Sequence, residues 1–78
     1  MSREIVMKAF TVALDLPAGT DIEALEIGVN PEWDSIGHMA LVAELEERFG
    51  IALDTDDLIA MNTFAASIDV LKRYGVAV

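Results

Sequence analysis

The chain has 78 residues, which is room for one domain, residues 1–78. Hydrophobic residues make up 54% of it and Cys is absent, which excludes a disordered chain, disulfides, thiolate metal sites and cysteine nucleophiles. The net charge of −9 disfavours nucleic acid and anionic lipid as partners, and no stretch approaches the ~18 apolar residues of a membrane span. We therefore expect a cytoplasmic protein, complete from its initiator Met, that neither binds nucleic acid nor inserts into a membrane.

The negative charge is concentrated in the middle of the chain. Residues 20–57 carry eleven acidic side chains against the single base Arg48. Such a segment either keeps the surface solvated or docks basic partners, and composition leaves both interpretations open.

The first helix is predicted over residues 3–15, with Ser2 as its N-cap and Pro17-Ala18-Gly19 as its stop. Its core stripe is predicted from three- and four-residue spacing to be Ile5, Ala9, Phe10, Ala13 and Leu16. Residues 17–33 form a long connection whose scattered apolar residues predict that it is pinned to the core.

The second helix is predicted over residues 35–49, between Asp34 as N-cap and Gly50 as the terminating glycine. Its predicted apolar stripe consists of Ile36, Met39, Val42, Leu45 and Phe49, which Leu41 widens. The acid-rich run 54–57 predicts the start of a short third helix. A fourth helix is predicted to have Thr63 as its N-cap and to end at Gly75. The predicted fold is all-α, a four-helix bundle with a long first loop, a short third helix and no strand.

The tripeptide Asp34-Ser35-Ile36 is the strongest candidate for chemistry. A serine in the first turn of a helix lies beside unpaired N–H groups and the positive end of the helix dipole, which suits a phosphodiester on its hydroxyl. From Trp33 to Ile51 the chain closely resembles the acyl carrier protein family, in which an Asp-Ser-Leu motif opens the second helix. The long loop before the motif, the ending Glu-Glu-Arg-Phe-Gly and the acidic four-helix pattern extend the resemblance to nearly the whole chain.

The resemblance implies that Ser35 carries 4′-phosphopantetheine, that Asp34 helps the transferase and its metal engage, and that Ile36 anchors partner enzymes. The protein would then be a monomeric carrier without catalysis of its own, which holds acyl groups as thioesters for fatty-acid, polyketide or specialised lipid and polysaccharide biosynthesis. Its partners would be a phosphopantetheinyl transferase and acyl-loading and acyl-processing enzymes with basic docking surfaces. Another carboxylic cargo, such as an amino acid, is the alternative, and Asp34 favours acyl cargo because peptidyl carriers have Gly-Gly before the serine region.

Two further sets of residues follow from the resemblance. The predicted partner-binding residues are Ile36, Met39, Glu44, Glu47, Asp56 and Asp57. The predicted acyl pocket consists of Met39, Val42, Leu45, Ile59 and Met61. Core packing is the alternative for the apolar residues, and a solvated face is the alternative for the acids. The chain departs from many fatty-acid carriers at Gly37, His38 and Ala40, where those carriers have acidic residues.

Two neighbours of the motif have structural interpretations. Trp33 is expected to plug the loop onto the bundle, and His38 is expected on the surface of the second helix, near the arm.

Three other functions share some features of the sequence. A hydrolase triad of Asp34, Ser35 and His38 is hard to assemble from adjacent residues of one helix. A calcium loop begun at Asp54 would need Gly at position 59 and Glu at position 65, where the chain has Ile and Ala, so no metal site is predicted. A small acidic adaptor without cofactor would share every feature except a reactive Ser35.

Overall fold

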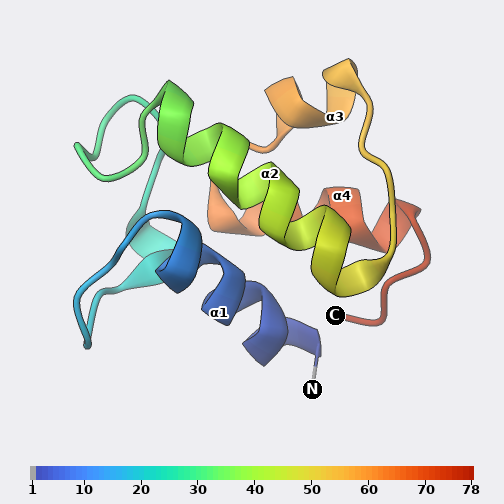
Figure 1. The fold of residues 1–78 in the computed structure, drawn as a ribbon, viewed down its shortest axis with the longest axis horizontal. Coiled ribbons are helices and arrows are strands. Elements are labelled where there is room, and N and C mark those ends of the chain that lie inside the picture. Colours follow the sequence, from blue (N-terminus) through green and yellow to red (C-terminus); the bar gives the residue numbers. More distant parts are fainter. Residues whose placement is uncertain (1) are drawn as a thin grey trace.

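The computed structural model describes residues 2–78 and contains four α-helices, with no strand in that range. The elements are α1 (Ser2–Ala13), the 3-10 helix η1 (Ile22–Ala24), α2 (Ser35–Phe49), α3 (Thr55–Ala60) and α4 (Phe64–Arg73). In Figure 1, α1 and α2 lie side by side and run in opposite directions, and α2 passes between α1 and the short α3. The all-α fold with a long first loop and a short third helix is confirmed.

Helix α2 has the bounds that its sequence predicts, because both of its ends are built from the expected residues. The Asp34 carboxylate accepts a hydrogen bond from the Gly37 N–H at 2.7 Å, which caps the N-terminus. At the other end Gly50 adopts a left-handed conformation, φ 63°, and Ile51 N–H donates back to the carbonyl of Glu46 at 3.2 Å.

Helix α1 ends earlier than predicted, at Ala13. The prediction relied on Pro17, but the chain already turns at Asp15, whose φ of 51° is left-handed. The N–H of Leu16 then donates to the carbonyl of Thr11 at 3.0 Å, the arrangement that Gly50 gives α2. Asp tolerates this conformation better than most residues, so a helix can end there without glycine.

The start of α1 and part of its apolar stripe were also predicted wrongly. Ser2 is the first residue of the helix itself. Ile5 is 40% exposed, and its neighbour Val6 is fully buried in its place. Ala9 and Phe10 lie in the core as predicted.

The buried face of α2 agrees with the predicted stripe at Val42 and Leu45 and with its widening at Leu41, and it differs from the stripe nearer the N-terminus. Ile36 is 82% exposed and Met39 is 56% exposed. The residues of α2 that are buried are His38, Leu41, Val42 and Leu45. The predicted stripe is thus wrong at Ile36 and Met39, whose apolar side chains remain in solvent.

An aromatic cluster joins the loop to the helices. Trp33 is fully buried, and its ring meets that of Phe10 edge to face at 5.1 Å between centroids. Phe10 in turn packs against Phe64 of α4 at 5.3 Å. The prediction that Trp33 plugs the loop onto the bundle is confirmed.

The rest of the long connection is pinned as predicted. Leu25 is buried, an isolated antiparallel bridge pairs Glu26 with Thr63, and the N–H of Ile27 donates to the carbonyl of Asn62 at 3.1 Å. These contacts hold the segment before Ser35 against the start of α4, so the N-terminus of α2 has a fixed position.

Candidate functional site

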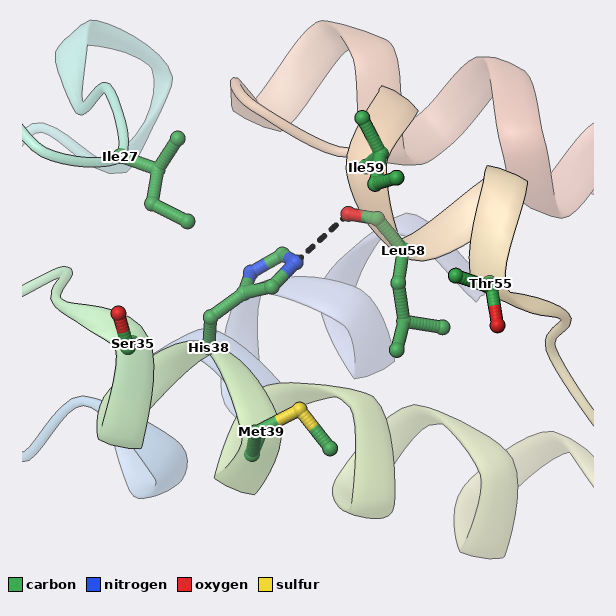
Figure 2. Close-up of a pocket in the computed structure, with 7 residues that line it drawn as sticks. All are labelled: Ile27, Ser35, His38, Met39, Thr55, Leu58 and Ile59. Carbon is green, nitrogen blue, oxygen red and sulfur yellow. Dashed lines mark hydrogen bonds between the residues drawn. The ribbon is translucent and has the colours of Figure 1, made fainter.

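Ser35 is the first residue of α2, and its exposed side chain borders a hollow of about 360 Å³. Figure 2 shows the hollow between the first turns of α2, the loop at Ile27 and the short α3. Its lining consists of Ile27, Ser35, His38, Met39, Thr55, Leu58 and Ile59. A hydroxyl therefore stands at the edge of a mostly apolar surface depression.

The Ser35 hydroxyl is not used by the fold. Asp34 supplies the N-cap, so the hydroxyl of Ser35 has no capping role, and within residues 2–78 it has no hydrogen-bond partner. It sits in the first turn, where the helix dipole favours negative charge. The hydroxyl is thus free for covalent modification, and a phosphate group there would be electrostatically favoured.

Gly37 allows α1 and the loop to approach the first turn of α2 closely. A Cβ at this position would lie 2.8 Å from Cδ2 of Leu14 and 3.2 Å from the backbone oxygen of Glu32. From the sequence, Gly37 is notable only as a position where many related carriers have an acid. The steric requirement has no helical signal in the sequence, because it comes from Leu14, which follows the end of α1, and from Glu32 of the loop.

His38 is buried, with 8% of its surface exposed, so the prediction of a surface histidine was wrong. The indole N–H of Trp33 donates to Nδ1 of His38 at 2.9 Å, and Nε2 of His38 is 2.8 Å from the carbonyl oxygen of Leu58. An indole can only donate and a carbonyl can only accept, so the ring is neutral with its hydrogen on Nε2. His38 thereby satisfies a carbonyl in the last turn of α3 and ties α2 to α3.

The acidic residues that the sequence assigned to partner binding differ in their exposure to solvent. Glu47 and Asp56 are exposed. Glu44 is half-buried and pairs with Arg48 at 2.9 Å, one turn along the same helix.

Asp57 is buried, with 7% of its surface exposed, so its placement on a docking surface was wrong. It completes the capping box of α3 with Asp54 and accepts a hydrogen bond from the hydroxyl of Tyr74. That hydrogen bond is the main reason why the pKa of Asp57 is lowered, and the nearby Arg73 guanidinium, 3.4 Å away, acts in the same direction. The same hydrogen bond raises the pKa of Tyr74.

The residues predicted for the acyl pocket divide into two groups. Met39 and Ile59 line the hollow. Val42, Leu45 and Met61 do not line it, and Leu45 and Met61 are fully buried in the core. Ile27 and Leu58, which line the hollow, were not predicted, since Ile27 lies in a loop without periodicity and Leu58 was assigned to a short helix of unknown orientation.

Apolar side chains surround the hydroxyl on the surface. Ile36 and Met39 of α2 and Ile59 of α3 are exposed by 82%, 56% and 73%. An apolar patch beside a modifiable hydroxyl is suited to contact with another protein. Within residues 2–78 no group of three or more His, Asp or Glu side chains is placed to hold a metal ion.

The bundle and its free first-turn serine define a helical carrier domain. A sequence profile for the family described as "Phosphopantetheine attachment site" matches residues 32–71, just over half of the chain. The chain belongs to this family, so it is a carrier protein of the acyl carrier type whose covalent cofactor is 4′-phosphopantetheine. Carriers of this family are non-catalytic and interact with the enzymes that modify them and process their cargo.

Comparisons with characterised proteins and with solved structures give no match. No helix in residues 2–78 has the length and apolar character needed to cross a membrane.

Proposed function

We propose that this protein is an acyl carrier protein whose arm is attached to Ser35. The observation that supports this is the Ser35 hydroxyl itself, which is exposed, without a hydrogen-bond partner and placed at the start of α2 inside the matched region. In the loading reaction the Ser35 oxygen would form a bond to the pantetheine-side phosphorus of coenzyme A. The phosphoanhydride bond would break, adenosine 3′,5′-bisphosphate would leave, and the hydroxyl proton would pass to a base of the transferase.

The arm supplies a thiol to a chain that has no Cys, and this thiol would hold the cargo as a thioester. An acyl cargo fits the hollow beside Ser35, because Ile27, Met39, Leu58 and Ile59 give it an apolar lining. An amino acid would place a charged ammonium against that lining, which is unfavourable. The pathways proposed are those of fatty acids, polyketides or specialised lipids and polysaccharides, with residues 1–78 as a single carrier domain.

The partners proposed are a phosphopantetheinyl transferase and acyl-loading and acyl-processing enzymes. Ile36, Met39 and Ile59 offer them an apolar contact beside the arm. Glu47 and Asp56 are exposed acids that basic groups on such enzymes could meet at the rim of the contact.

The test is loading by a broad-specificity transferase with coenzyme A and magnesium, followed by intact mass. The wild type should gain one arm and Ser35→Ala should gain none. Thr55→Ala is the matched control, because Thr55 is also the first residue of a helix, is also capped by a preceding Asp, and lines the same hollow. Full loading of Ser35→Ala, or no loading of the wild type, would overturn the assignment of Ser35.

A further inference from the structure

The imidazole of His38 stands between the surface hollow and the aromatic core. It lines the hollow, and its ring lies 5.9 Å from that of Trp33, which in turn contacts Phe10. Figure 2 shows the imidazole reaching from α2 across to Leu58 of α3. A group that moved inward from Ser35 between these two helices would meet His38 first.

The ring is held by hydrogen bonds at both nitrogens. Trp33 donates to Nδ1 and Nε2–H donates to Leu58, at 2.9 Å and 2.8 Å. Trp33 is fully buried, so rotation of His38 out of the way would leave its indole N–H without a partner, away from water. The imidazole is therefore a fixed barrier and not a flexible side chain that yields to a ligand.

The space on the outer side of this barrier is small and open. A hollow of about 360 Å³ is near the lower end of the ~300–1,000 Å³ of small-molecule pockets. Two of its walls, Met39 and Ile59, are themselves more than half exposed. On the core side of the imidazole the molecule is packed, since Trp33 and its neighbour Phe10 are fully buried there.

We propose that the His38 bridge between Trp33 and Leu58 limits the cargo to short acyl groups, which lie in the hollow beside Ser35 while the core stays closed to longer chains. This inference rests on the proposed function, since it concerns cargo on an arm at Ser35. His38 acts here as a specificity-determining residue and takes no part in chemistry.

The experiment compares butyryl and dodecanoyl forms of the protein, prepared with the transferase from the matching acyl-coenzyme A and checked by intact mass. A dodecanoyl chain that buried even a few more methylene groups would raise the Tm by about 10 °C in a domain of this size. For the wild type we expect no such gain of dodecanoyl over butyryl. The indole N–H resonance of Trp33, the single Trp of the chain, should also be the same in both forms.

Three variants test whether His38 is the barrier. In His38→Ala the dodecanoyl form should gain about 10 °C over the butyryl form, and the Trp33 resonance should shift between the two. Trp33→Phe removes the donor to Nδ1 and so allows the imidazole of His38 to rotate. The Tm of this variant should therefore also depend on the length of the acyl chain. Trp33→Phe replaces His38→Ala in the test if His38→Ala does not fold. Thr55→Ala enlarges the hollow at its rim and leaves the bridge intact, so it should behave as the wild type.

The outcomes separate this inference from the function on which it rests. A wild type that takes no arm refutes the proposed function, and the inference falls with it. A wild type that is loaded and is stabilised by dodecanoyl by about 10 °C over butyryl overturns only the inference. If the Tm does not depend on acyl chain length in the wild type or in folded His38→Ala and Trp33→Phe, His38 is not the barrier.

Discussion

Gly37→Ala should destabilise the protein, although alanine is the better helix former. In an unobstructed helix this change would gain about 1 kcal/mol. Here the new methyl group would lie 2.8 Å from Cδ2 of Leu14 and 3.2 Å from the backbone oxygen of Glu32. Leu14 is buried, so its side chain can move only by disturbing the core, and overpacking of this kind costs about 1–3 kcal/mol. The net loss expected is about 1 kcal/mol, or roughly 4–8 °C in Tm.

A double-mutant cycle with Leu14→Ala isolates the clash. Leu14→Ala alone should cost about 2–5 kcal/mol, because it leaves a cavity. In that background the main obstacle to the new methyl group is gone, so Gly37→Ala should be neutral or stabilising, with a coupling free energy of about 1 kcal/mol or more. Urea denaturation followed by circular dichroism gives all four free energies of unfolding.

The matched control is Ala43→Gly, an exposed position of the same helix. It reverses the propensity change without a clash, so it should cost about 1 kcal/mol in both the wild-type and the Leu14→Ala background. If Gly37→Ala costs the same in both backgrounds, or if it is more stable than the wild type, the close approach of α1 to α2 is not what selects glycine at this position.

Three further predictions concern the acids and the surface. The hydrogen bond from Tyr74 is the main reason why the pKa of Asp57 is lowered, so this contact stabilises the fold at pH values above the ordinary pKa of an Asp, and the stabilisation is lost as the pH falls through the lowered pKa. In urea denaturation, Tyr74→Phe should therefore lose less stability relative to the wild type at acidic pH than at neutral pH. A loss of stability that does not depend on pH would contradict this. Glu47→Gln should slow association with the transferase by up to about tenfold and make the association rate less dependent on salt. Glu44→Gln removes a charge that is paired with Arg48, so it should cost about 0.3–0.5 kcal/mol of stability and change the association rate less. If the association rates of the wild type and Glu47→Gln depend on salt equally, Glu47 does not dock the transferase. Ile36→Ala should change the free energy of unfolding by less than about 0.5 kcal/mol, since Ile36 is 82% exposed, but should lower the rate of loading; an unchanged loading rate would remove Ile36 from the contact surface.

The starts of α2, α3 and α4 could be predicted because local chemistry marks them. Asp34, Asp54 and Thr63 each cap the helix that follows through their own side chain, and a capping residue works with neighbours three positions away. The end of α1 could not be predicted from Pro17, because Asp15 adopted a conformation that only a minority of Asp residues take.

Which face of a helix is buried was harder to predict than where the helix lies. Met39 and Ile36 are as apolar as Leu41 and Val42, so hydropathy alone could not tell which pair turns inward. The buried side also carries a polar residue, His38, whose two hydrogen bonds replace those it would make with water. Leu58 is distant in the sequence and Trp33 lies in the loop before α2, so no helical spacing rule includes these partners.

The first turn of α2 combines a fixed backbone with a free hydroxyl. Asp34 caps the helix, Gly37 admits α1 and the loop, and His38 ties the same turn to α3. These three contacts come from three directions and leave Ser35 and Ile36 facing solvent between them. We therefore expect the backbone of this turn to keep its shape if the proposed arm is attached to Ser35. Different acyl groups on the proposed arm would then change the contacts in the hollow lined by His38, and not the backbone conformation around Ser35.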